Sequence, residues 1–191
     1  LVQRRSDSNT SRYGTLETIR EYALERLEES GRADKLRLRH AQHYADVFEA
    51  TAPAAMSPTL MTLFTCELDN VRLAFDTAVA SRAGPVALRL AVSTARYWIV
   101  RGAADEGARR VRGAIAIADE GRPLLRARAL EVAAELERHR GDIAAAIGLA
   151  TESRRVARTA ASPQLEGEAL IALGRALVEA GEVDAAARSL E

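Results

Sequence analysis

Two histidines one helical turn apart are the first residues whose types and spacing suggest chemistry. His40 and His43 stand at positions i and i+3 of an expected helix, so both imidazoles lie near one face and can approach a metal ion. No cysteine or carboxylate beside them completes a set of metal ligands. We therefore expect surface or partly packed histidines and predict no metal site.

The next candidates are a cysteine and two carboxylates in the segment from 66 to 69. Cys66 has no base near it in sequence, and a lone cysteine in an Ala/Leu-rich helix usually behaves as a small apolar residue. Glu67 and Asp69 resemble an acid and base pair, but a spacing of two directs them to different sides of a helix. We expect solvated carboxylates here, or a salt bridge to Arg72, and predict no catalytic residues.

Two arginine clusters and one aromatic pair form the candidate partner or ligand surface. A nucleic-acid surface would require aromatic residues among the arginines, and none are interleaved with them here. We therefore expect solvated helix faces paired with nearby glutamates. An anion or partner site stays an alternative, as does direct DNA contact, which we do not expect. The candidate surface residues are Tyr97, Trp98, Arg109, Arg112, Arg154 and Arg158, beside Arg110 and Arg155.

The aromatic pair has two interpretations. Trp98 comes four residues before Gly102, where a large side chain can fill the gap between stacked helix pairs. We favour this core role for Trp98. A position facing a ligand on a concave surface is the alternative for Tyr97 and Trp98.

The chain also lacks the sequence signatures of several activities. It has no GxxxxGK[ST] phosphate loop, no acidic metal-binding strand, and no recognisable helix-turn-helix or cyclase signature. We expect a non-enzymatic chain that holds no cofactor of its own.

Composition indicates closely packed helices. Of the 191 residues, 48% are hydrophobic and only 4% aromatic, and much of the apolar content is alanine, the strongest helix former. Lysine plus arginine equals aspartate plus glutamate at 27 each, so no net charge draws the chain to nucleic acid or anionic lipid. The chain shows no signal-peptide pattern and no long uncharged apolar run, and the expected location is cytoplasmic.

Helical spacing of apolar residues extends over nearly the whole chain. The first helix carries Leu16, Ile19 and Leu24 on one face and ends at Ser30-Gly31. The spacing predicts a second helix over 35–51 and a third from Ser57-Pro58 to about residue 80.

From residue 85 onward the chain repeats. Gly102, Gly141 and Gly181 are 39 and 40 residues apart, and each follows one apolar helix and precedes another. Five positions after each glycine is a small residue, Gly107, Ala146 or Ala186. Glycine permits a tight turn and the small residue a close approach, so the pattern predicts antiparallel helix pairs that stack.

The last copy resembles a tetratricopeptide repeat. Leu170, Leu173, Gly174 and Leu177, then Gly181, Ala186 and Leu190, match that family's packing positions. Ala95 and Ala134 replace the first-helix glycine in the earlier copies, and the intervals exceed the usual 34 residues. We expect a tetratricopeptide-like superhelix, cut within its final helix at Glu191.

The phrases "RYGTLETIREYALERL", "RLRHAQHYADVFEA" and "ELDNVRLAFDTAV" resemble a run in bacterial signal-transduction ATPases, NB-ARC-like regulators of the LuxR-type or adenylate-cyclase-linked kind. The resemblance implies the tail of a winged helix over 1–16, a β-hairpin turning at Asp7 to Thr10. It further implies a helical connector over 17–80 and tetratricopeptide-like repeats over 81–191, an all-α fold apart from the hairpin.

That resemblance implies a sensor or interaction region of a transcriptional regulator. A protein, peptide or small-molecule inducer is expected on the repeats, which would control an upstream module that binds ATP and magnesium. A constitutive protein–protein scaffold without switching is the alternative. No membrane partner is expected.

Overall fold

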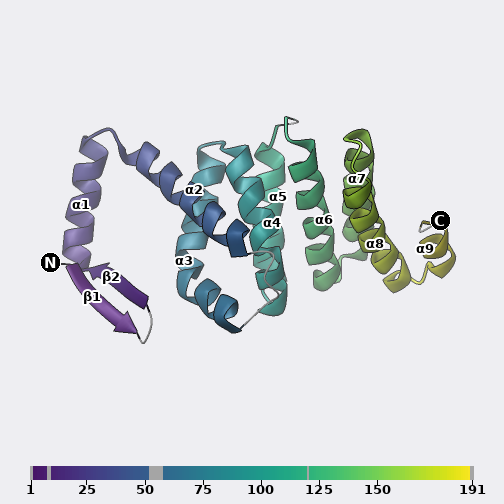
Figure 1. The fold of residues 1–191 in the computed structure, drawn as a ribbon, viewed down its shortest axis with the longest axis horizontal. Helices are drawn as coiled ribbons and strands as arrows, with labels where there is room; N and C mark the ends of the chain where they lie inside the picture. The colour runs from purple at the N-terminus through teal and green to yellow at the C-terminus, as the bar shows by residue number, and fades with distance from the viewer. Residues whose placement is uncertain (1, 8–9, 52–57, 120, 190–191) are drawn as a thin grey trace. The chain divides into compact units, whose positions relative to one another are not determined.

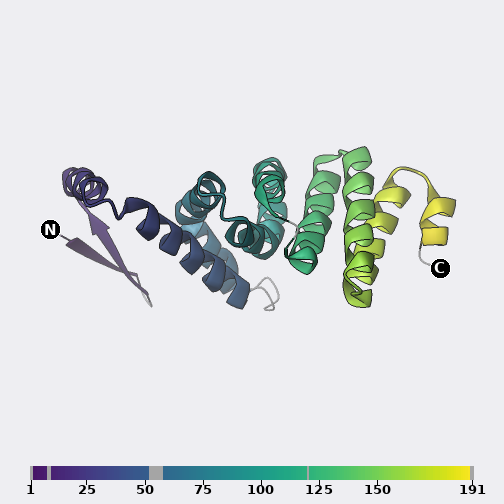
Figure 2. The same ribbon diagram turned by 90° about the horizontal axis from the view of Figure 1, so that it is seen from above.

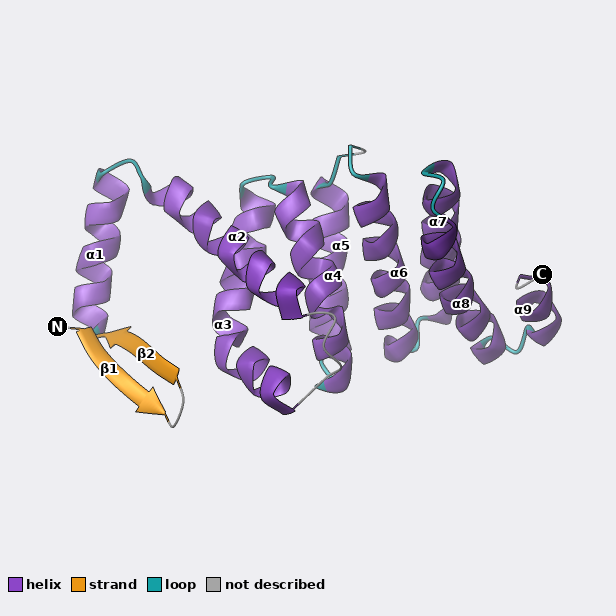
Figure 3. Ribbon diagram, in the orientation of Figure 1, coloured by secondary structure: helices purple, strands orange, loops and turns teal. Residues whose placement is uncertain are grey.

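The structure is a computed structural model that describes residues 2–7, 10–51, 58–119 and 121–189. Within these ranges the chain is α-helical from residue 17 onward, with two short strands before the first helix (Figure 3). Two compact units divide the chain, residues 1–39 and residues 40–191. The expected connector over 17–80 is therefore shared between both units.

The first unit begins with two strands. β1, Val2–Asp7, pairs antiparallel with β2, Thr10–Thr15, in a register that sets Val2 opposite Thr15. Residues 8 and 9 of the expected turn lie outside the described residues.

Helix α1, Glu17–Glu29, follows the strands and buries none of its residues. Its expected apolar face is open, since Leu16 is 51% exposed and Leu24 is 43% exposed. The predicted stop is confirmed, because Gly31 has a left-handed φ of 65° directly after Ser30.

Two helices lead into the core of the second unit. α2 spans Ala33–Thr51 and α3 spans Pro58–Ala80, in agreement with the predicted ranges 35–51 and 58–80. Phe48 of α2 stacks on Phe64 of α3 with ring centroids 4.0 Å apart, and Phe64 stacks on Tyr97 at 4.4 Å. This aromatic row joins α3 to the helix pairs in one core, because all three rings are almost fully buried.

Three helix pairs follow, in chain order from teal to yellow in Figure 1. The first pair is α4, Gly84–Val100, with α5, Ala104–Ile117; the second is α6, Pro123–Arg140, with α7, Ile143–Thr159; the third is α8, Pro163–Glu179, with α9, Val183–Ser189. Figures 1 and 2 both show α6 between α5 and α7, and α6 also packs on α4 and α8.

Each pair turns at the glycine that the repeat predicts. Gly102, Gly141 and Gly181 have φ values of 68°, 82° and 81°, a left-handed region that favours glycine. After each turn, the amide of the residue that follows the glycine donates back to the first helix; in the second pair, Asp142 N donates to Glu137 O at 3.0 Å. The predicted role of these glycines is confirmed.

The small residue five positions later permits close helix packing, as predicted. A Cβ on Gly107 would lie 2.7 Å from Cβ of Trp98 and 2.9 Å from Cδ2 of Leu136. Ala146 is fully buried at the same place in the second pair, and Ala186 is 5% exposed in the third. Gly107 therefore lets α5 approach both α4 and the following pair.

Proline opens the first helix of each of the three pairs. Pro85, Pro123 and Pro163 stand at the first or second position of α4, α6 and α8. Proline suits this place because the first amides of a helix have no intrahelical acceptor. The first helices of the pairs are therefore marked in sequence as clearly as the turns.

Candidate functional site

The side of the second unit formed by α4, α6 and α8 is hollowed. A cavity of about 530 Å³ lies there, which we call the α4–α6–α8 cavity, and its apolar wall is made by Ala95, Ile99, Val100 and Val132. It forms because successive first helices pack on one another, α4 on α6 and α6 on α8. Cavities of roughly 300–1,000 Å³ are the usual size of small-molecule sites.

Most charges at this cavity are paired across helices. Glu135 of α6 accepts a hydrogen bond from Nη2 of Arg138 at 3.0 Å and another from Nη1 of Arg175 of α8 at 3.2 Å. Arg138 also pairs with Glu179 of α8. These contacts tie α6 to α8 and neutralise the cavity's arginines on that side.

Glu131 is the one carboxylate of the cavity lining that lacks such a pair among the described residues, and Arg96 is a lining cation without one. Glu131 is half-buried and lines the cavity one helical turn before Glu135, and no ion pair joins it to an arginine in the described part of the chain. Burial raises the pKa of Glu131 to about 7, with further increases from the carboxylates of Glu135 and Glu168. The cations of Arg128 and Arg175 oppose this rise only in part.

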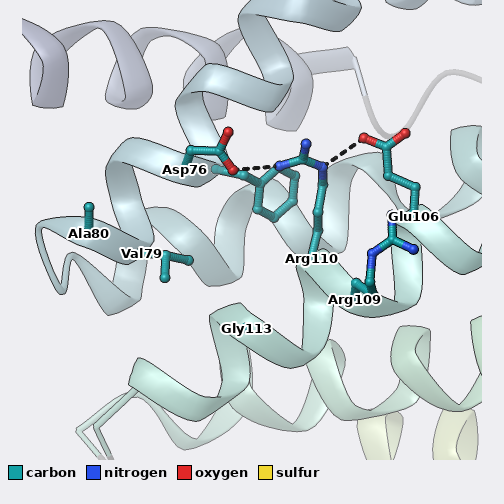
Figure 4. Close-up of a pocket in the computed structure, with 8 residues that line it drawn as sticks. Asp76, Val79, Ala80, Glu106, Arg109, Arg110 and Gly113 are labelled. Carbon is teal, nitrogen blue, oxygen red and sulfur yellow. Dashed lines mark hydrogen bonds and ion pairs between the residues drawn. The ribbon is translucent and has the colours of Figure 1, made fainter.

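In a second hollow, the α3–α5 pocket of about 470 Å³, the lining carboxylates are paired with arginines (Figure 4). Arg110 donates to Asp76 at 2.9 Å and to Glu106 at 3.0 Å, as the dashed lines show. Arg72 of α3 holds the same Glu106 carboxylate with two hydrogen bonds, of 2.8 and 2.7 Å. Hydrogen bonds from Arg72, followed by those from Arg110, lower the pKa of Glu106 to about 2.

Tyr97 and Trp98 do not belong to a partner or ligand surface, which corrects that prediction. Their exposed fractions are 2% and 1%, because Tyr97 stacks on Phe64 and Trp98 packs against Gly107. The indole Nε1 of Trp98 donates to Oγ1 of Thr94 at 3.2 Å, so its polar atom is also used internally. The favoured core role of Trp98 is confirmed.

Three of the four predicted arginines are engaged in ion pairs. Arg112 lies 3.1 Å from the buried carboxylate of Glu137, and Arg154 and Arg158 of α7 both contact Glu166 of α8, at 3.4 and 2.7 Å. The expectation of helix faces paired with glutamates is met at these positions. Arg109 is exposed at the α3–α5 pocket (Figure 4).

The remaining sequence candidates lie apart from both hollows. His40 and His43 flank the ring of Tyr44, at centroid distances of 4.8 and 5.3 Å, and burial lowers the pKa of His40. Asp69 pairs with Arg72 at 3.3 Å, as expected. Within the described ranges, no group of three or more histidine, cysteine or acidic side chains is arranged for a metal ion.

Glu67 and Cys66 are neighbours on α3 with different surroundings. Glu67 accepts hydrogen bonds from the hydroxyl of Tyr44 at 2.8 Å and from Nδ2 of Asn70 at 2.7 Å. Cys66 is exposed and forms no disulfide. Glu67 therefore joins α2 to α3 through Tyr44.

Glu131 was not singled out by sequence reasoning. One signal was present: Glu135 and Arg175, which pair in the cavity, are one repeat interval apart in sequence. Searching for opposite charges separated by that interval finds the cavity's paired residues. Glu131, one turn away on the same helix face, is then the acidic residue left over.

The sequence comparisons point to regulators of transcription. Proteins named "Putative HTH-type transcriptional regulator", from Mycobacterium bovis and from two strains of Mycobacterium tuberculosis, are 37% identical to this chain over 103 residues. The chain is similar to these regulators. The match covers 51% of this chain and 11% of the length of each relative.

The other comparisons found no relatives. No protein-family profile matches the chain, and no solved structure matches it at a significant level. Among the described residues, no helix is both long and apolar enough to cross a bilayer.

Proposed function

We propose that this chain is a non-catalytic sensor or interaction region of a multidomain, ATP-dependent transcriptional regulator. It binds a protein, peptide or small-molecule signal and controls a nucleotide-binding module that lies upstream in the same protein. ATP and magnesium belong to that module, and this chain holds no cofactor. The regulator acts in the cytoplasm.

One observation carries the proposal: a chain similar to transcriptional regulators has a cavity that is shared by three successive helix pairs. Such a cavity is sensitive to small changes in packing between pairs, because residues of all three pairs line it. The repeat at 39 and 40 residues, with its glycine turns and small packing residues, supports a tetratricopeptide-like array.

The first unit fits the role of a junction. β1 and β2 followed by α1 have the order that the resemblance implies, the tail of a winged-helix subdomain followed by a helix, and they carry the phrase that resembles the end of a nucleotide-binding module. In this proposal, α1 to α3 transmit the state of the helix pairs to that module.

The mechanism is a shift between two states of the regulator, one held inactive and one released. A signal changes this balance only if it binds the released state more tightly, since a ligand with equal affinity for both shifts nothing. Residues 81–191 supply the differential contacts, and the upstream module supplies the response.

The test uses an intact regulator that contains this sequence. Deletion of residues 81–191 is expected to change its ATPase rate, its oligomeric state and the output of a reporter gene. The matched control is Glu182→Gln, a charge change at an exposed turn between α8 and α9. Unchanged ATPase, assembly and reporter output after the deletion contradict the proposal.

A constitutive scaffold is the second candidate. Three apolar side chains of α8 and α9 favour it, since Ile171, Val178 and Val183 are 50%, 55% and 62% exposed and border one hollow. Exposed apolar residues gathered at one place mark protein-binding surfaces. A partner that binds the intact regulator equally with and without nucleotide, with no effect on reporter output, supports the scaffold.

A further inference from the structure

The charges around the α4–α6–α8 cavity leave one carboxylate uncompensated. Glu135 is paired with Arg138 and Arg175, and Arg128 lies 3.9 Å from Glu168. Arg138 reaches Glu179 as well. Each acidic neighbour of Glu131 is therefore ion-paired with an arginine, while in the described part of the chain no ion pair joins Glu131 itself to one.

The cavity beside Glu131 has room and an apolar wall. Residues of α4, α6 and α8 line its volume of about 530 Å³, with Ile99 and Val132 half-buried and Val100 exposed along the wall. A group placed there meets an acidic end at Glu131 and hydrocarbon on the α4 side. This arrangement suits a molecule that has one charged end and an apolar body.

We propose that the α4–α6–α8 cavity binds a small organic monocation, an amine or guanidine whose charged group contacts Glu131 and whose apolar body lies against Ile99, Val100 and Val132. This inference rests on the proposed function, because it names the chemical class of the signal.

The position of Glu131 favours a single positive charge, because Glu131 is the one lining carboxylate without an arginine partner among the described residues. Only one carboxylate is uncompensated, so a second cationic group finds no partner at the cavity. Arg96 and His139 also line it, and the Arg96 guanidinium is exposed and repels further positive charge. A basic peptide with several lysines is therefore disfavoured, whereas a neutral ligand leaves the Glu131 carboxylate without a partner.

Protonation of Glu131 makes the affinity for the ligand depend on pH. The pKa of Glu131 is about 7, so the group is mostly neutral at pH 5 and mostly ionised at pH 8. The charged groups that face it are Glu135 and Arg128 on α6, and Glu168 and Arg175 on α8. A cation binds the ionised form more tightly, so affinity rises from pH 5 to pH 8 and binding releases protons between these values.

The experiment measures binding to the 191-residue chain by isothermal titration calorimetry, with three probes of nearly the same shape. These are 3-phenylpropylamine, 3-phenylpropan-1-ol and 3-phenylpropionate, which are cationic, neutral and anionic at pH 8. A charge-assisted hydrogen bond predicts that the amine binds at least about tenfold more tightly than the alcohol. The propionate is expected to bind most weakly.

Variants assign the effect to one residue. Glu131→Gln is expected to abolish the preference for the amine and its pH dependence, while Glu182→Gln, which removes the same charge at an exposed turn, preserves both. Circular dichroism checks that each variant is folded.

Three results overturn the proposal: an amine that binds no more tightly than the alcohol, an unchanged preference in Glu131→Gln, or tighter binding of an acetylated tetralysine peptide than of the amine. These results leave the proposed function standing, since that function is judged by deletion of residues 81–191 from the intact regulator. Conversely, amine binding with no effect of the deletion contradicts only the regulatory role.

Discussion

Two glutamates in similar surroundings have pKa values that are shifted in opposite directions. Glu106 and Glu131 are both partly buried, and both line a hollow between packed helices. The pKa of Glu106 falls to about 2, while that of Glu131 rises to about 7, from the same ordinary value of 4.5. Burial raises both, so neighbouring charges decide the difference.

For each glutamate, one neighbour lies on its own helix and one on another helix. Glu106 is held by Arg72, which is 34 residues away on α3, and by Arg110 on its own helix. Glu131 has carboxylates as its strongest charged neighbours, one on its own helix and one on α8. In a repeat array, a carboxylate is thus structural where the adjacent helix pair supplies an arginine to it, and available for a ligand where it does not. A buried carboxylate without an arginine partner is therefore a candidate functional residue.

The largest effect is expected from disturbing the helix packing on which both hollows depend. Gly107→Ala places a Cβ within 3.0 Å of Trp98 and Leu136, so α5 must move away from its neighbours. We expect a loss of about 3 kcal/mol in the free energy of unfolding, measured by urea denaturation. Gly113→Ala on the same helix is the control, because its Cβ meets only Cγ2 of Val79 at 3.9 Å. That control is expected to stabilise the protein by up to about 1 kcal/mol, and equal losses from both changes contradict the packing role of Gly107.

Removing the charge of Glu106 tests the paired hollow. Glu106→Gln leaves the guanidiniums of Arg72 and Arg110 without their shared carboxylate, and we expect a loss of about 1–2 kcal/mol at pH 7. The pKa of Glu106 is lowered on folding, so its contribution is present above about pH 4.5 and is lost as the pH falls toward 2. The gap in stability between wild type and variant should therefore narrow below pH 4.5, and a gap that widens there refutes the assignment.

Removing the charge of Glu131 should have the opposite effect on the free energy of unfolding. The pKa of Glu131 is raised on folding, so the unfolded chain ionises first and stability falls as the pH rises from 4.5 to 7. Glu131→Gln avoids this cost and is expected to stabilise the chain by about 1–2 kcal/mol at pH 8, with little effect at pH 4. Thermal or urea unfolding at both pH values provides the measurement. Destabilisation at pH 8 would show that Glu131 is paired after all.

The smallest effect concerns a cation near Glu131. Arg175 lowers the pKa of Glu131, so Arg175→Gln is expected to raise that pKa further. An NMR titration of the carboxyl carbon follows the change. Arg101→Gln, at an exposed turn, serves as the control and should leave the titration unchanged. A fall in the pKa of Glu131 in the Arg175 variant would mean that Arg175 acts through structure and not through charge.

Local features of the sequence predicted the helices and turns. The ranges 35–51 and 58–80, the glycine turns and the close approach at Gly107 followed from apolar spacing, proline and glycine, whose effects act within a few residues. The repeat interval also indicated which helices pair. Exposure of the apolar face of α1 was not predicted, because spacing alone does not say whether another element covers a face.

The candidate site was decided by tertiary structure. The sequence placed Tyr97 and Trp98 near a turn, but only the stacking on Phe64 and the packing on Gly107 fixed them in the core. Apolar spacing, glycine and the repeat interval were sufficient to predict the helices, their turns and their pairing. The packing of α6 against α8 set the charges around Glu131, because a carboxylate's pKa depends on burial and on groups a few ångströms away, and those groups come from distant parts of the chain.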